Sequence, residues 1–194
     1  MAFDTNALLA AARLSVQNPR AAARAVMQMR LPTSTGWLAI AVMVAVSAVL
    51  SAVAFIVSPM ADDPGMQELF GSPFRLALLQ GVVLVSAVGL VHGVGRWFGG
   101  TGQLADALAL MAWIEFLLIL LQIVQIIALL ALPPFAELLG LVGIGLSFWL
   151  MAHFVAELHG FKSAVMVFFG ILATGVAVSL VLAVLMVMVM GNRG

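Results

Sequence analysis

Four ionisable residues fall within, or at the ends of, long apolar stretches of this 194-residue sequence: His92, Glu115, His153 and Glu157. Imidazole and carboxyl side chains can relay protons, bind cations or pair with one another. A charged side chain at the centre of a bilayer costs about 2.5–3.5 kcal/mol even on insertion scales, so such residues are rare and often functional. We therefore take these four residues as a candidate intramembrane polar cluster.

Known enzyme signatures do not surround these residues. His153 and Glu157 are four apart, but a zinc peptidase motif needs two histidines at that spacing, and His159 lies six residues after His153. The glycine-rich segment 99–102 lacks the lysine of a phosphate-binding loop, and no G-x-S-x-G sequence occurs. The chain also contains no cysteine. We expect a protein that is not an enzyme, with no catalytic residues, no metal and no cofactor, and with Glu157 and His159 at the water interface.

Transmembrane helices are the elements that must position the cluster. Hydrophobic residues make up 64% of the sequence and charged residues 8%, against about 45–50% and 25% in soluble domains. Five apolar runs each exceed or match the roughly 20 helical residues that cross a bilayer. The predicted spans are 37–57, 76–95, 107–132, 138–158 and 164–190. The sequence therefore predicts an all-α integral membrane protein, a five-transmembrane-helix bundle with an N-terminal segment, 1–36, and a short external tail, 191–194.

The order of the spans predicts which polar residues meet. The short connection Leu132–Glu137 makes the third and fourth spans antiparallel neighbours, so Glu115 should lie close to His153. Three roles remain open for such a pair: an interhelical polar contact, a proton or substrate pathway, and a metal site. Small residues four apart, such as Gly89 and Gly93 in the second span, should allow close helix packing.

Basic residues predict the orientation in the membrane. Six of them fall on one side: Arg13, Arg20, Arg24, Arg30, Arg96 and Lys162. The other side carries only Arg75 and Arg193. Because cytoplasmic loops are enriched in Lys and Arg, the N-terminus should be cytoplasmic and, after five spans, the C-terminus periplasmic.

The N-terminal segment is predicted to form two short amphipathic cytoplasmic helices. Asn18 and Pro19 supply a cap and a first-turn proline for the second helix. Arg20, Arg24 and Arg30 could then contact anionic lipid headgroups from a helix lying in the interface plane. Two alternatives remain: a solvated connector that only enforces the orientation, and a mitochondrial presequence.

Several segments carry a resemblance to a known family. They are Asn18-Pro19-Arg20, Gly99-Gly100-Thr101-Gly102-Gln103, Pro133-Pro134 and Glu157-Leu158-His159-Gly160-Phe161-Lys162-Ser163. With five spans, this pattern resembles the Yip family (Ypt/Rab-interacting-protein domain), in its prokaryotic branch. The resemblance implies a cytoplasmic N-terminus. It also relates the chain to Golgi and endoplasmic-reticulum proteins that are associated with Rab GTPases and vesicle traffic. The N-terminal segment is shorter than the cytosolic domain of those proteins, and no catalytic residues carry over.

Two functions are compatible with this sequence. The first is a non-enzymatic bacterial inner-membrane protein that organises lipids or partner membrane proteins. Its partners would be the bilayer, anionic lipids, and another membrane protein or a second copy of the chain. The alternative is a small transporter or channel that uses the Glu/His cluster. Zero net charge argues against a nucleic-acid partner, and the absence of Tyr with a strong excess of Arg over Lys suggests a GC-rich bacterial genome.

Overall fold

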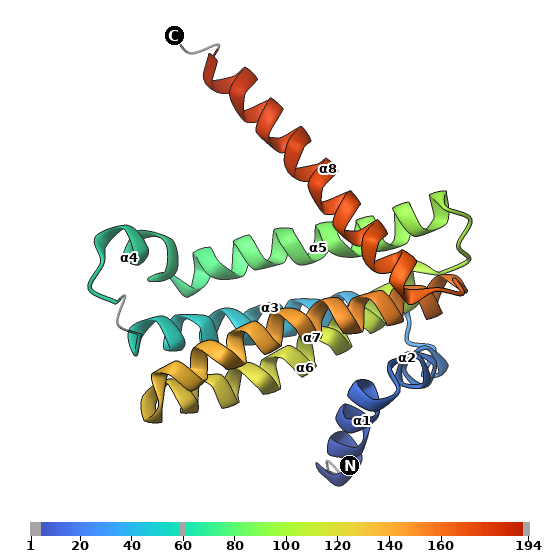
Figure 1. Ribbon diagram of the computed structural model, residues 1–194, viewed down its shortest axis with the longest axis horizontal. Helices are drawn as coiled ribbons and strands as arrows, with labels where there is room; N and C mark the ends of the chain where they lie inside the picture. The colour runs from blue at the N-terminus through green and yellow to red at the C-terminus, as the bar shows by residue number, and fades with distance from the viewer. Residues whose placement is uncertain (1–4, 59–60, 192–194) are drawn as a thin grey trace.

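The computed structural model describes residues 5–58 and 61–191, which form eight α-helices (Figure 1). In chain order these are α1 (Thr5–Gln17), α2 (Pro19–Gln28), α3 (Thr33–Ile56), α4 (Pro64–Phe70), α5 (Pro73–Trp97), α6 (Leu104–Ala131), α7 (Pro133–His159) and α8 (Ala164–Gly191). Five of them, α3, α5, α6, α7 and α8, are long and apolar enough to cross a membrane. The predicted all-α, five-span architecture is therefore confirmed.

The helix bounds differ from the predicted spans in a regular way. Four of the five long helices begin three to five residues earlier than predicted, because polar and proline residues join the first turn. The short helix α4 was not predicted. Apart from Gly191, which ends α8, the predicted external tail lies outside the described residues.

Prolines and capping side chains set where the helices begin. Proline occupies the first turn of α2, α4, α5 and α7, where its missing N–H would have no helical partner anyway. The Asn18 side chain accepts a hydrogen bond from the N–H of Ala21 (3.2 Å), as predicted from the Asn-Pro pair. Asp63 caps α4 in the same way through the N–H groups of Gly65 (2.8 Å) and Met66 (3.0 Å).

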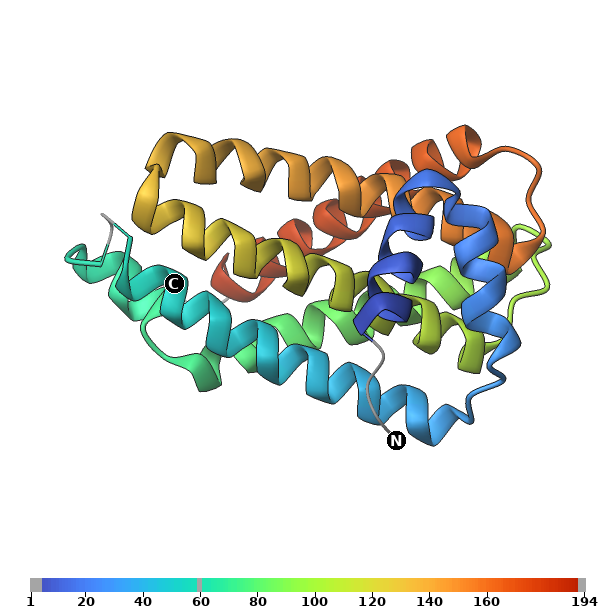
Figure 2. The same cartoon turned by 90° about the horizontal axis from the view of Figure 1, so that it is seen from below.

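The helices α3, α6 and α7 run side by side, with α5 packed against α3 (Figure 1). Close approach of α3 and α6 depends on a glycine: a methyl group at Gly36 would lie 2.7 Å from Cβ of Leu108. The helices α1 and α2 lie across one end of this group, where α2 contacts both α6 and α7 (Figure 2). We call this the basic end, because Arg13, Arg20, Arg24, Arg30, Arg96 and Lys162 lie there.

The best-buried part of the protein also lies at the basic end. Six consecutive residues of α6, Ala107–Ala112, are all buried, which requires neighbours on every side of the helix. These neighbours include Ala23 of α2 and Phe154 of α7, both almost fully buried. The basic end is therefore the most rigidly packed region of the described chain.

The last helix behaves differently. It packs mainly against α7 and leaves the bundle at a steep angle, crossing α5 (Figure 1). No described residue in its membrane-crossing part is buried within the chain. Nearly all of α8 is thus available to lipid or to a partner.

Candidate functional site

An ion-pair network holds α2 on the end of α7. Nη1 of Arg24 donates to Oε1 of Glu157 at 2.8 Å, and Nη1 of Arg20 lies 3.7 Å from Oε2 of the same carboxylate. Nη2 of Arg20 also donates to the backbone carbonyls of Phe161 (3.1 Å) and Lys162 (2.9 Å). Arg20 therefore joins α2 to the α7–α8 connection as well as to α7.

This network changes the interpretation of the N-terminal arginines. Lipid headgroup contact was predicted for Arg20, Arg24 and Arg30, but the first two have Glu157 as their partner within the chain. The sequence did not predict that pairing, because Glu157 is more than 130 residues away along the chain. Arg30 lies beyond α2 with a positive φ of 47°, and headgroup contact by this residue stays a prediction.

His159 is buried in a pocket made by three glycines. The N–H of Gly102 donates to its Nδ1 (3.2 Å), so Nε2 carries the hydrogen and donates to the carbonyl of Val91 (2.9 Å). A methyl group at Gly95, Gly100 or Gly102 would collide with the imidazole ring. His159 is only 3% exposed. Its side chain therefore faces the protein interior, and the prediction that it lies at the water interface is wrong.

The glycine pocket explains the glycine-rich connection between α5 and α6. The sequence showed only that segment 99–102 lacks the lysine of a phosphate-binding loop, whereas in the structure its backbone approaches an imidazole from the end of α7. Gly160, the residue after His159, ends α7 in the left-handed conformation (φ 73°), so the chain turns away immediately after the histidine. The sequence signal that could have revealed this pocket is the His159-Gly160 pair at the end of a helix, together with the three glycines Gly95, Gly100 and Gly102.

Glu115 lies between helices but has a different partner from the predicted one. Its carboxylate interacts with the hydroxyl of Ser47 on α3. Ser47 in turn accepts from Nε2 of Gln80 on α5 at 3.3 Å, which leaves its own hydrogen free for Glu115. One polar chain, Gln80–Ser47–Glu115, thus connects α5, α3 and α6.

Two further glutamines of α6 also bridge helices. Nε2 of Gln122 donates to Oγ of Ser51 on α3 (3.0 Å), and Nε2 of Gln125 donates to the carbonyl of Ala136 on α7 (3.2 Å). Such contacts fix the rotation of one apolar helix against another, which lipid-facing residues cannot do.

The predicted cluster of His92, Glu115, His153 and Glu157 does not assemble. Nδ1 of His153 bonds the carbonyl of Trp149 on its own helix (2.8 Å), and the two rings lie 4.0 Å apart. Although α6 and α7 are neighbours as predicted, no described ion pair or hydrogen bond joins His153 to Glu115. The reason is helix rotation: Glu115 faces α3 rather than α7. His92 keeps its Nδ1 buried without a described partner.

A hydrogen bond also attaches α1 to the bundle. Nε1 of Trp113 on α6 donates to the buried hydroxyl of Ser15 (2.9 Å), which donates in turn to the carbonyl of Ala11 (2.9 Å). The exposed surface of α1 includes Leu9 and Val16.

In the described part of the chain, no three His, Asp or Glu side chains converge as metal ligands would.

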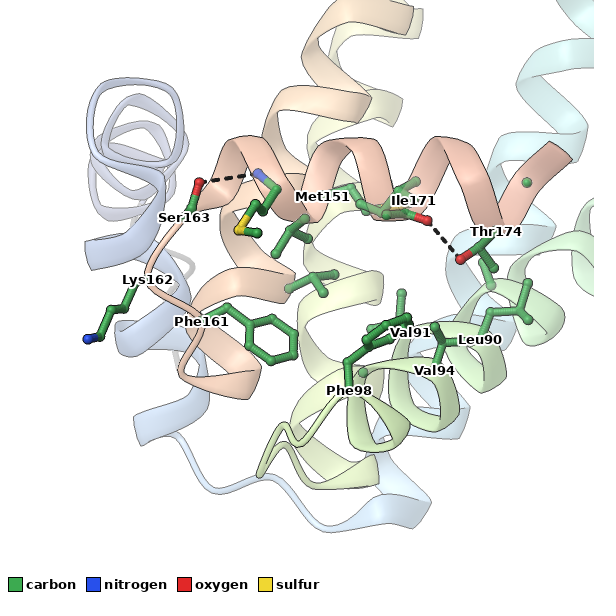
Figure 3. A pocket seen from close by; sticks show the side chains of 17 residues that line it. Leu90, Val91, Val94, Phe98, Met151, Phe161, Lys162, Ser163, Ile171 and Thr174 are labelled. Carbon is green, nitrogen blue, oxygen red and sulfur yellow. Dashed lines mark hydrogen bonds between the residues drawn. The ribbon is translucent and has the colours of Figure 1, made fainter. Parts of the chain in front are cut away.

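An apolar groove of about 540 Å³ lies where α8 crosses α5, with α7 beneath it (Figure 3). We call it the α5/α8 groove. Val91, Val94 and Phe98 line one wall, and Met166 and Ile171 line the other. Phe161 points into it at the basic end, whereas Lys162 points away from the apolar walls (Figure 3). Glu115, His92 and His153 line neither this groove nor a second cavity between residues 55 and 72.

In a comparison with protein families, the chain matches the family model described as Yip1 domain over residues 13–186. That range includes the ion-pair network, the glycine pocket, the polar chain and the α5/α8 groove. No curated protein and no solved structure matches the chain significantly.

Proposed function

This chain belongs to the Yip1 domain family, and from that membership we propose that it is a non-enzymatic membrane organiser. In this role it gathers lipids or a partner membrane protein around a rigid helical bundle and performs no chemical reaction. We assign it to the prokaryotic branch of the family and to the bacterial inner membrane.

One observation supports an organiser over a transporter: the polar side chains lie between the helices, whereas the walls of the groove are apolar. Glu115, Gln122 and Gln125 are engaged in contacts between helices. The α5/α8 groove, by contrast, is apolar and lies where α8 departs from the bundle. A transport route needs polar groups along a water-filled path, whereas a lipid or a partner helix needs an apolar surface facing the bilayer.

The proposed orientation places the basic end in the cytoplasm. The positive-inside tendency supports this, since six of the eight basic residues lie at that end. Trp97 and Phe98, both largely exposed there, are suited to the membrane–water interface. The exposed side of α1, with Leu9 and Val16, is then available to a partner at the cytoplasmic surface.

The proposal is tested by isolating the full-length tagged protein from its own membrane in mild detergent and measuring bound proteins and lipids by mass spectrometry. We expect either a stoichiometric partner or one lipid class enriched over the bulk membrane. A partner bound through α1 should be lost in Leu9→Ser/Val16→Ser and kept in Glu137→Gln, a control at the opposite end. Bulk lipid composition without any partner would contradict an organising role.

The transporter hypothesis has one observation in its favour, the polar chain Gln80–Ser47–Glu115 in which Oε1 of Gln80 is buried without a described partner. It is tested in proteoliposomes that carry a pH-sensitive dye or a cation indicator. A proton or cation flux that is abolished in Glu115→Gln would favour transport. The organiser proposal expects equal leak from both proteins.

A further inference from the structure

We propose that the α5/α8 groove holds one acyl chain of an anionic phospholipid whose headgroup lies at the basic end between Arg96 and Lys162. This inference rests on the lipid half of the proposed function and gives it a site and a ligand class. Three properties of the groove carry it: its shape, the chemistry of its walls and the charge at its basic end.

The shape of the groove fits a single extended chain. Along α8 its lining runs from Ser163 to Gly175, which at the helical rise is about 18 Å. That length is close to one leaflet, roughly half of a 30 Å hydrocarbon core. One acyl chain of a phospholipid occupies one leaflet, so the length of the groove matches a single chain.

The walls of the groove offer a ligand almost no hydrogen bonds. The hydroxyl of Thr174 donates back to the carbonyl of Gly170 (2.8 Å), and the hydroxyl of Ser163 accepts from the N–H of Met166 (3.2 Å). Apart from Lys162 at the basic end, the remaining lining is aliphatic, aromatic, methionine or glycine. Such walls suit a hydrocarbon chain and disfavour a polar solute, which would lose its hydration without replacement.

The basic end of the groove carries two cationic residues. Arg96 is in the last turn of α5, and Lys162, which lines the groove, lies two residues before α8 begins, so both residues lie at the same end of the two helices. The nearby acid, Glu157, is already paired with Arg20 and Arg24. Neither Arg96 nor Lys162 forms an ion pair with a described residue, so both are free to bind a phosphate headgroup.

The test uses native mass spectrometry of the full-length protein after incubation with equal amounts of phosphatidylglycerol and phosphatidylcholine. We expect a one-to-one complex in which phosphatidylglycerol is at least fivefold preferred. Arg96→Gln/Lys162→Gln should bind both lipids about equally. Equal binding by the unchanged protein, or an unchanged preference in this variant, would refute the headgroup assignment.

A matched pair of glycine substitutions tests the acyl-chain position. Gly170 lines the groove and has open space around it, so Gly170→Leu should fill the groove and lower lipid occupancy at least fivefold. Gly145 on α7 also has open space but lies outside the groove, so Gly145→Leu should retain the lipid. Equal occupancy in the two variants would overturn the proposal.

A measurement on the unchanged chain does not depend on how the variants fold. Phosphatidylglycerol with a photoreactive group in its acyl chain should label peptides that contain Phe98 and residues 166–171. Labelling elsewhere only, or a dimer that excludes lipid, would contradict the proposal. Such a failure would leave partner capture through α1 untouched, whereas flux dependent on Glu115 would overturn the proposed function itself.

Discussion

His159 illustrates how much a single side chain can organise in an apolar protein. Both of its ring nitrogens are used, one by the N–H of Gly102 and one by the carbonyl of Val91. These two partners come from the α5–α6 connection and from α5, whereas the histidine belongs to α7. The imidazole therefore fixes three segments relative to one another at the basic end.

Substitution of the glycine nearest this ring should be destabilising. In Gly95→Ala the new methyl group would collide with Nε2 of His159, so the ring would have to move and the hydrogen bond to Val91 would be lost. We expect a cost of about 1–3 kcal/mol, typical of overpacking at a buried site. Thermal unfolding in mild detergent measures it. The control is Gly93→Ala on the same helix, which has open space and should be neutral or slightly stabilising; equal unfolding temperatures for both variants would argue against the glycine pocket.

Double-mutant cycles should separate the true partner of Glu115 from the expected one. Ser47→Ala and Glu115→Leu remove the same contact, so their effects on unfolding should be non-additive by about 0.5–1 kcal/mol. The cycle of Glu115→Leu with His153→Ala should be additive within about 0.3–0.5 kcal/mol, because the structure does not join these side chains. A coupling in the second cycle that exceeds the first would restore the predicted pair.

At the scale of elements, the sequence predicts which segments are helices better than it predicts how each helix is rotated about its axis. Long apolar runs are sufficient for five helices, and Asn18-Pro19 is sufficient for the start of α2. Apolar helices, however, are hydrophobic on all sides, so periodicity does not reveal which face of α6 carries Glu115 toward α3. The same limit applies to small residues: Gly89 and Gly93, predicted to pack, face open space in the described chain.

The attachment of α2 makes a prediction at this scale. Glu157→Gln removes the charge that holds Arg20 and Arg24, and hydrogen–deuterium exchange in α2 should rise while the buried start of α6 stays protected. The arginine side chains are partly exposed, so the ion pairs are screened and the effect should weaken at high salt. Glu137→Gln, a charge loss at the other end, is the control. Unchanged exchange in α2 would mean that apolar packing alone keeps it in place.

The whole molecule has a strongly asymmetric charge distribution along the bundle axis, and this yields a topology prediction. The chain has no cysteine, so single cysteines can be introduced without other changes. In intact cells, Glu137→Cys should react with a membrane-impermeant maleimide, whereas Met29→Cys should react only after permeabilisation, since both residues are exposed at opposite ends. The reverse pattern would place the basic end outside.

At the scale of the whole molecule, the sequence predicts features that depend on burial in lipid. It does not predict features that depend on contacts between residues far apart in the chain. Composition alone identifies a membrane protein, because 8% charged residues cannot cover a soluble surface. The α5/α8 groove has no counterpart in the sequence, since it arises from the angle at which α8 leaves α7. That angle depends on the packing of the α7–α8 connection rather than on the hydropathy of α8.

The two hydrogen bonds from Arg20 to the carbonyls of Phe161 and Lys162 have a mechanical consequence. Those carbonyls belong to the connection between α7 and α8, so the N-terminal segment helps to hold the start of the last helix. Pulling α2 away from α7 breaks these hydrogen bonds and leaves α8 held mainly by its first turns against α7. The position of α2 in this way constrains where α8 begins, although four membrane-crossing helices separate Arg20 from Phe161 in the sequence.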